Sequence, residues 1–134
     1  MPEFVKWETA FNTGVEIIDE QHKELVNMLN ELYVAQEDNK KIYLDKFLDY
    51  SNFHFGTEEK VMEYVKYPQL KNQILSHRKF IDFVETSIKN IESISLDDLF
   101  DFAVDWLVNH ILREDQEFGK FIHKRNIKIN FQDL

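Results

Sequence analysis

The segment IYLDKFLDYSNFHFGTEEKVMEYV, residues 42–65, has apolar side chains at a spacing of three to four residues. This period predicts a long amphipathic helix. Its inward-facing positions are Leu44, Phe47, Leu48, Ser51, His54, Phe55, Glu58, Val61 and Met62. His54 and Glu58 interrupt a largely apolar face, and burying such groups is costly unless each has a partner. We therefore expect partners for both side chains inside the protein.

Two further segments show the same period. One covers about residues 19–36 and precedes the polar stretch EDNKK; its inward-facing positions are Ile18, His22, Leu25, Leu29 and Leu32. The other begins near Pro68, a residue that suits the first turn of a helix. Its inward-facing positions are Leu70, Gln73, Ile74, His77, Phe80, Ile81, Val84 and Ile88.

The last periodic segment opens with SLDD, where Ser95 and Asp98 have capping-box spacing with Asp in place of the usual Glu. Its inward-facing positions are Leu99, Phe100, Ala103, Leu107, His110, Ile111, Phe118, Phe121 and Ile122. Four long amphipathic segments with short connections predict an all-α fold, an antiparallel up-down four-helix bundle. We expect a single domain with an irregular arm (1–18), the bundle (about 19–123) and a short tail (124–134).

The composition excludes several functions. Sixteen Lys and Arg against 25 Asp and Glu give a formal charge of −9, without the basic stripe of a nucleic-acid binder. The absence of cysteine rules out disulfides and sulfur ligands, so that any metal must be held by nitrogen and oxygen. No signal-like or membrane-spanning stretch is visible. We expect a soluble cytoplasmic protein that binds neither nucleic acid nor membranes.

Four of the five histidines lie one to a predicted helix, each on the inward face: His22, His54, His77 and His110. Two lie near the starts of their helices and two in the second halves. In an antiparallel bundle, with a rise of 1.5 Å per residue, this places all four near the same end. Independent core histidines have no reason to gather in this way.

Oxygen-bearing side chains accompany these histidines. Glu58 follows His54 by four residues, and Gln73 precedes His77 by four, so each pair shares a helical face. On the last helix the companion is either Glu114 or Asp115, and α-helical spacing by itself favours Glu114.

Imidazoles with carboxylates suit zinc, iron, manganese or copper. Four histidines and two carboxylates exceed the needs of one tetrahedral zinc, and a two-metal site bridged by carboxylates accounts for them best. The alternative is a set of buried pairs that satisfy one another, which leaves the clustering unexplained. Ferritin-like di-iron bundles are set aside because their Glu-x-x-His motif is absent.

Several segments in order resemble the hemerythrin family, specifically its single-domain bacterial form. They are WETAFNTGVEIIDEQHKEL (7–25), HFGTEE (54–59), SHRKF (76–80) and WLVNHILREDQEFG (106–119). The resemblance spans about Phe4 to His123. It implies an oxygen-binding centre of two non-haem iron ions.

The resemblance also implies the ligands. One iron would take His22 and His54, and would offer the open position at which O2 binds. The other takes three histidines in the family, of which His77 and His110 are matched. Two carboxylates bridge the irons together with an oxo or hydroxo group. The family pattern His-Ile-x-x-x-Asp selects Asp115, and Glu58 matches the other bridge.

The sequence departs from the family at Gln73, which stands where the third histidine is expected. Gln73 could be a weak ligand, could hold a water in that place, or could mark a degraded metal position. We predict a water-filled or labile position, because an amide is a poorer donor to iron than imidazole. His123 is no replacement, since it lies about 20 Å beyond His110 along the helix.

The functional prediction is O2 binding for carriage, storage or delivery. The alternatives are a sensor of oxygen, redox state or nitric oxide, and a peroxidase-like di-iron enzyme. Peroxide, nitric oxide and small anions are further candidate ligands. Trp106, Leu107 and Ile111 are predicted to line the ligand pocket and to exclude water. The same apolar pattern is also typical of ordinary core residues.

Overall fold

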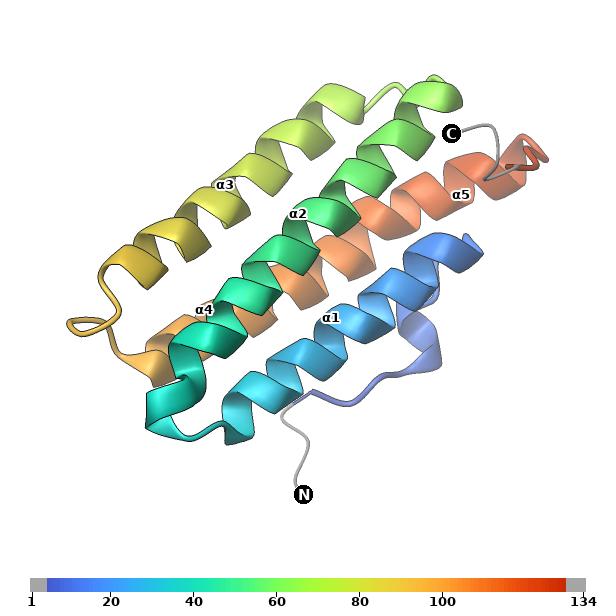
Figure 1. Cartoon of the computed structure of the whole chain (residues 1–134). Helices are drawn as coiled ribbons and strands as arrows, with labels where there is room; N and C mark the ends of the chain where they lie inside the picture. The colour runs from blue at the N-terminus through green and yellow to red at the C-terminus, as the bar shows by residue number, and fades with distance from the viewer. Residues whose placement is uncertain (1–4, 130–134) are drawn as a thin grey trace.

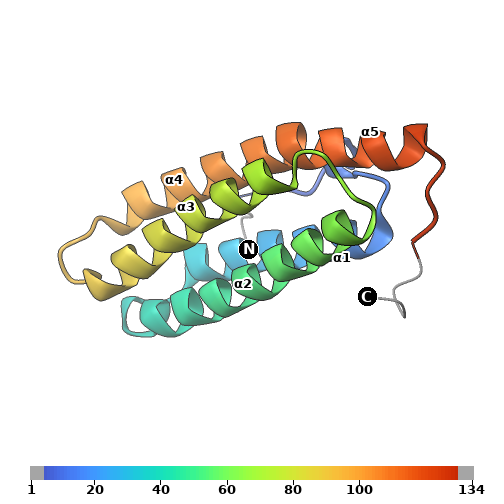
Figure 2. The same ribbon diagram turned by 90° about the horizontal axis from the view of Figure 1, so that it is seen from above.

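The computed structural model describes residues 5–129 and is helical throughout, with no strand in that range (Figure 1). Helix α1 covers Glu16–Val34, α2 covers Lys40–Tyr64 and α3 covers Leu70–Lys89. The fourth rod consists of α4 (Leu96–Asn109), a π-helical turn η3 (His110–Asp115) and α5 (Gln116–Lys124). Short 3-10 turns, η1 (Thr9–Phe11) and η2 (Glu37–Asn39), precede α1 and α2. Figures 1 and 2 show successive rods running in opposite directions, which confirms the predicted four-helix bundle.

Most predicted helix boundaries differ by a few residues from those in the structure. Helix α1 begins at Glu16, inside the expected arm, and α2 begins at Lys40. Pro68 is not in the first turn of α3, because the chain first reverses direction at Lys66 (φ +58°) and the helix starts only at Leu70.

The predicted cap of the last rod is present in part. The Ser95 hydroxyl accepts a hydrogen bond from the Asp98 backbone N–H at 3.3 Å. Such a cap stabilises a helix by about 1 kcal/mol because it satisfies a backbone donor that has no partner within the helix.

The buried apolar side chains form clusters on either side of a polar layer. One of them lies around Phe55, Phe80 and Leu107, and another around Ile18 and Phe118. The predicted polar residues lie between these two clusters along the bundle. Apolar packing therefore shields the polar layer from solvent on both sides along the bundle. Electrostatic interactions within the layer are stronger than they would be in water.

The arm before α1 is anchored to the bundle by hydrogen bonds. The Asp19 carboxylate accepts from the backbone N–H groups of Thr13 (2.7 Å) and Gly14 (3.0 Å). Gln116 donates to the backbone carbonyls of Ala10 and Asn12 from the other side. The arm is thus held between α1 and α5, beside the π-helical turn.

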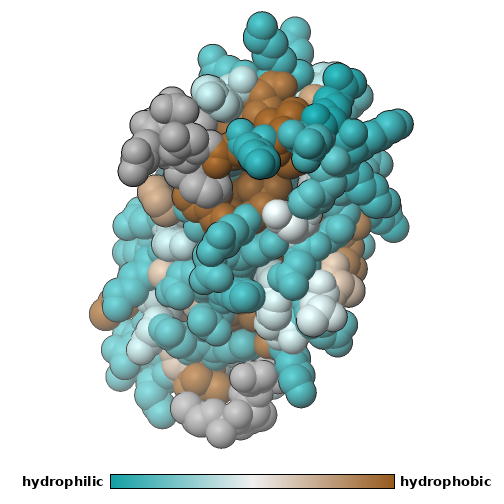
Figure 3. Space-filling model, turned by 90° about the vertical axis from the view of Figure 1, so that its right-hand side faces the viewer, coloured by the Kyte–Doolittle hydropathy of each residue, from teal (hydrophilic) through white to brown (hydrophobic). Residues whose placement is uncertain are grey.

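The outer surface is mixed in character. Figure 3 shows a face on which hydrophilic side chains surround a hydrophobic area. Single large apolar side chains such as Phe53 and Leu75 are also exposed. Within residues 5–129, no helix is both long enough and apolar enough to cross a membrane.

Candidate metal centre

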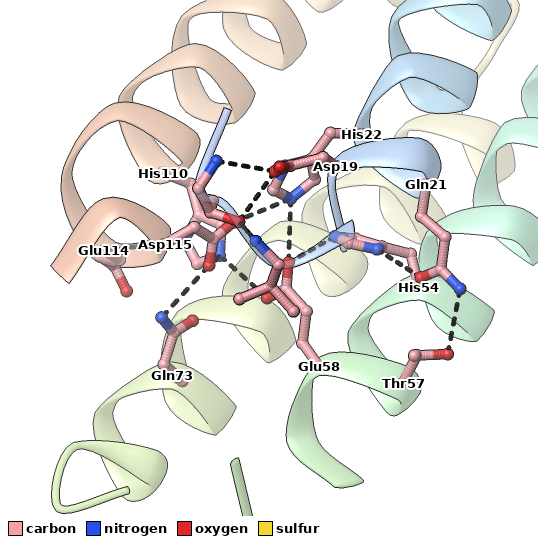
Figure 4. Close-up of polar contacts among 12 residues, drawn as sticks. Asp19, Gln21, His22, His54, Thr57, Glu58, Gln73, His110, Glu114 and Asp115 are labelled. Carbon is pink, nitrogen blue, oxygen red and sulfur yellow. Dashed lines mark hydrogen bonds and ion pairs between the residues drawn. The ribbon is translucent and has the colours of Figure 1, made fainter. Parts of the chain in front are cut away.

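The structure brings six of the predicted site residues together in the bundle interior (Figure 4). All of them are at most 2% exposed, and all four rods contribute at least one: His22, His54, Glu58, His77, His110 and Asp115. We call His22 and His54 the first histidine pair, and His77 and His110 the second histidine pair.

The first histidine pair faces one oxygen of each carboxylate. His22 Nε2 lies 3.0 Å from Glu58 Oε1 and 3.0 Å from Asp115 Oδ2. His54 Nε2 lies 2.6 Å from the same Glu58 oxygen. Four side chains can therefore offer one ligand atom each to a single cation at this position.

The second histidine pair faces the opposite oxygens. His77 Nε2 lies 3.2 Å from Glu58 Oε2, and His110 Nε2 lies 3.3 Å from Asp115 Oδ1 and 3.8 Å from Glu58 Oε2. The Nε2 atoms of His77 and His110 are themselves only 3.1 Å apart. Each carboxylate thus has one oxygen directed to each pair, as bridging between two cations requires.

Hydrogen bonds outside the cluster test whether a metal fits. His54 Nδ1–H donates to Gln21 Oε1 at 2.8 Å, and His77 Nδ1–H donates to Glu59 Oε2 at 2.8 Å. A neutral imidazole has a single N–H, so each Nε2 is left with a lone pair directed into the cluster. Metal-binding histidines are typically oriented in this way. The donors present therefore fit a pair of cations.

Unpaired atoms inside the cluster support the same conclusion. Among the described residues, His54 Nε2, Glu58 Oε2 and Asp115 Oδ2 are buried and form no hydrogen bond, although each lies 2.6 to 3.2 Å from another polar atom of the cluster. Buried polar atoms almost always have a partner. Lone pairs that converge from α2 and the fourth rod without hydrogen bonds indicate a positively charged guest.

The pKa values show where protons are held in the cluster. Burial lowers the pKa of His22, but the Asp115 and Glu58 carboxylates outweigh burial and raise the pKa to about 9. Burial dominates at His54, whose pKa is lowered. Burial raises the pKa of Glu58, but the charge on His54 and bonds from the other imidazoles hold the pKa well below its ordinary value. The carboxylates are therefore ionised at neutral pH and ready to bind cations.

The π-helical turn decides between Asp115 and Glu114. In a π-helix the hydrogen bonds span five residues, so the residue five positions after His110 returns to nearly the same face. Asp115 therefore points into the cluster. Glu114 instead lies at its edge, 3.4 Å from His110 Nδ1 and 3.0 Å from Ser76 Oγ. Spacing for an ordinary α-helix favours Glu114, whereas the widened helix directs Asp115 into the cluster.

Gln73 lies beside the second histidine pair, where the sequence places it. Its side chain is 2% exposed, and its Nε2 donates to Asp115 Oδ1 at 3.3 Å. Its Oε1 is buried and has no partner among the described residues. His123, by contrast, is exposed on α5.

The predicted pocket residues lie next to the cluster. Trp106 stacks on the His110 ring with centroids 4.6 Å apart and planes 13° apart. Leu107 and Ile111 are buried in the same apolar cluster as Phe55. They form an apolar surround for the metal centre on the α4 side.

Sequence reasoning missed Gln21 and Glu59 as partners of the site histidines. Both residues stand directly beside predicted ligands, Gln21 before His22 and Glu59 after Glu58. Each, however, contacts a histidine of another helix. Only the pairing of helices reveals that contact.

Fold and site together define a four-helix bundle with a buried centre for two metal ions. Comparison with known proteins agrees: the hemerythrin HHE cation binding domain matches residues 13–122. A bacteriohemerythrin from Stenotrophomonas maltophilia is 34% identical over 120 residues, covering 84% of this chain and 78% of that protein. A myohemerythrin from Theromyzon tessulatum is 31% identical over 119 residues, covering 88% and 93% of the two chains.

Solved structures show the same likeness. A crystal structure of a leucine-to-tyrosine mutant of hemerythrin matches with a TM-score of 0.81 at 28% identity, covering 88% of this chain and 96% of that chain. The chain therefore belongs to the hemerythrin family, whose fold binds O2 and other small ligands at a non-haem di-iron centre.

Proposed function

We propose that this protein binds O2 for carriage, storage or delivery, with two iron ions held inside the bundle. One observation carries the proposal: Glu58 and Asp115 each present one oxygen to the first histidine pair and the other to the second. Two carboxylates placed in this way would hold two cations close to each other. When bound, two ferrous ions supply the electrons that oxygen binding draws on.

The proposed ligands divide between the two ions. His22 and His54 would hold one ion, His77 and His110 would hold the other, and Glu58 and Asp115 would bind both. Trp106, Leu107 and Ile111 keep bulk water away from the small ligand; Leu107 and Ile111 are buried, and the partly buried Trp106 packs against them, which supports this role. The cytoplasmic location expected from the sequence stays a prediction.

Gln73 makes the second ion's position labile in this proposal. Its amide oxygen is unpaired, and its nitrogen donates to Asp115. A surface cleft of about 430 Å³ reaches Gln73 between α3 and the fourth rod; it is lined by polar side chains including Ser76, Lys79 and Glu114. Water can approach the second ion from this side. A third histidine in place of Gln73 would otherwise fill that ligand position.

The same cleft favours a second candidate function. A small polar molecule such as hydrogen peroxide could reach the second position through it, which supports a peroxidase-like di-iron enzyme. Rapid turnover of peroxide by the iron-loaded protein, lost in Gln73→His, distinguishes this candidate from an oxygen carrier.

The test of the main proposal is metal analysis combined with a visible spectrum. We expect two irons per chain after anaerobic loading, and a charge-transfer band that appears with O2 and disappears when O2 is removed. His54→Ala should lose the band, whereas a change at the exposed His123 should not. Zinc as the resident metal, or no metal uptake, would contradict the proposal.

A further inference from the structure

Ser51 is a buried hydroxyl that the metal centre leaves unexplained. Its side chain is 1% exposed, and its Oγ has no hydrogen-bond partner among residues 5–129. A serine inside a helix ordinarily bonds the carbonyl four residues earlier. Ser87 on α3, equally buried, does so by donating to the Phe83 carbonyl at 2.8 Å. Ser51 lacks that bond, so its O–H is free to serve another acceptor.

Ser51 lies about one helical turn before the metal centre on α2. It precedes His54 by three residues and Glu58 by seven, so all three side chains share one face of the helix. Phe47 and Phe55, one turn to either side of Ser51, both contact the same Phe80 ring with centroids 6.1 Å apart. Ser51 therefore belongs to the layer adjoining the site histidines.

This layer is otherwise apolar. Each rod contributes the residue three positions from its histidine, after it on α1 and α3 and before it on α2 and α4: Leu25, Phe80, Ser51 and Leu107. Because neighbouring rods are antiparallel, these positions lie at one level. All four side chains are at most 1% exposed. One hydroxyl thus stands in an apolar layer beside a site for a small ligand.

Aromatic rings separate the second histidine pair from this layer. Phe55 stacks on His77 with centroids 4.0 Å apart, and Trp106 stacks on His110 at 4.6 Å. Within residues 5–129 the first histidine pair has no stacked ring: His22 and His54 meet edge to face at 4.6 Å, and Phe55 lies 5.5 Å from His54 at a tilt of 49°. A ligand extending into the layer is therefore expected on the His22 and His54 side.

We propose that the Ser51 hydroxyl donates a hydrogen bond to the outer atom of a small ligand, O2 or a linear anion such as azide, bound beside the first histidine pair. This inference rests on the proposed di-iron function. A neutral donor in an apolar layer can form a hydrogen bond with a ligand that has an acceptor atom at its outer end. A ligand that consists of a single atom does not reach the donor and gains no such hydrogen bond.

Azide binding to the diferric protein tests the proposal, with Ser51→Ala compared with the matched control Ser87→Ala. Loss of one hydrogen bond to a charged ligand should raise the Kd for azide about tenfold in Ser51→Ala. The infrared stretch of bound azide should shift in that variant and lose its sensitivity to D2O. Ser87→Ala should bind azide like the native protein.

The thermal stability without azide gives a second measurement of opposite sign. Ser51→Ala removes an unpaired buried hydroxyl and should raise the Tm by about 2 to 5 °C, whereas Ser87→Ala breaks an existing bond and should not raise it. An azide Kd within twofold of native in Ser51→Ala overturns the role of Ser51 alone. If the native iron-loaded protein binds neither azide nor O2, the proposed function fails and this inference with it.

Discussion

The two histidine pairs face the same two carboxylates, Glu58 and Asp115. They differ in the groups that lie near the Nδ1 atoms of their imidazoles. In the first pair, His54 is held by the neutral amide of Gln21, and His22 Nδ1 has no partner among the described residues. In the second pair, a carboxylate lies near each Nδ1: it is hydrogen-bonded to His77 but only an ion-pair neighbour of His110.

The carboxylates behind the second pair are Glu59, 2.8 Å from His77 Nδ1, and Glu114, 3.4 Å from His110 Nδ1. A carboxylate behind a metal-binding histidine makes it a stronger donor. Burial lowers the pKa of His77 and His110, yet the surrounding carboxylates raise the pKa of both above its ordinary value. The comparison teaches that the pair beside Gln73 is the pair with charged support. In the proposed centre this support would offset part of the deficit left by a missing third histidine.

The largest expected effect is that of Glu58→Gln, because this carboxylate serves both pairs. An amide keeps the shape but removes the charge, so the affinity for both metals should fall by more than about 100-fold. Metal content after dialysis against a chelator measures the effect. Glu63→Gln, an exposed change on the same helix, serves as the control. One metal retained at native affinity would show that the two pairs act independently.

Gln73→His should sharpen the difference between the pairs, because it adds an imidazole to the second pair alone. A third imidazole in the second pair should slow the loss of its metal to a chelator by about 10- to 100-fold, and should also slow autoxidation. Stopped-flow chelation and the decay of the oxygen-dependent band measure the two effects.

The control for this substitution is Gln69→His, which alters the same cleft at an exposed position. It should change neither rate. Equal autoxidation in the native protein and Gln73→His would remove the reason to assign Gln73 a role.

Glu59→Gln should weaken the charged support of the second pair without disturbing its geometry. The amide oxygen still accepts from His77 Nδ1, so the ring stays in place while the negative charge is lost. Retention of the second metal should fall about tenfold, with the first nearly unchanged. Glu63→Gln again provides the comparison, and an equal loss at both metal positions would contradict the division into two halves.

The smallest expected effect is proton release on metal uptake. The pKa of His22 is raised to about 9, above its ordinary value of 6.5, so the metal-free protein holds this proton at pH 7. The stabilisation from that proton is fully present below pH 6.5 and is lost as the pH rises through 9. A metal must displace the proton, so its affinity should increase with pH over this window.

A pH-indicator dye in weak buffer measures this release directly. We expect His22 to contribute about one of the protons released by each chain that takes up metal at pH 7, and His77 and His110, whose pKa values are also raised, to add to the release. His22→Ala should release fewer protons than the native protein. Uptake without any proton release would show that His22 is already neutral in the metal-free state.

Part of this site could be predicted from sequence because helical spacing is a local property. The repeat that buries Phe47 and Val61 also places His54 and Glu58 on the same inward face, whatever the rest of the chain does. Asp115 could not be obtained from that rule, since the π-helical turn changes the spacing between His110 and Asp115. A family resemblance selected it, whereas α-helical geometry favours Glu114.

The start of α3 shows a similar limit. Pro68 is suited to a helical first turn, but the reversal at Lys66 delays the helix until Leu70. Local preference cannot report this, because a connection between two rods must also fit their separation.

The amino-acid sequence by itself determined the four rods, their inward faces and the presence of one histidine on each, because these follow from a repeat of 3.6 residues. The tertiary structure decided which atoms meet: which carboxylate oxygen faces which pair, that Gln21 and Glu59 support histidines on other helices, and that the Ser51 hydroxyl is left unpaired. The physical reason is that hydrogen bonds and metal sites depend on distances between helices. Spacing along one helix does not contain that information.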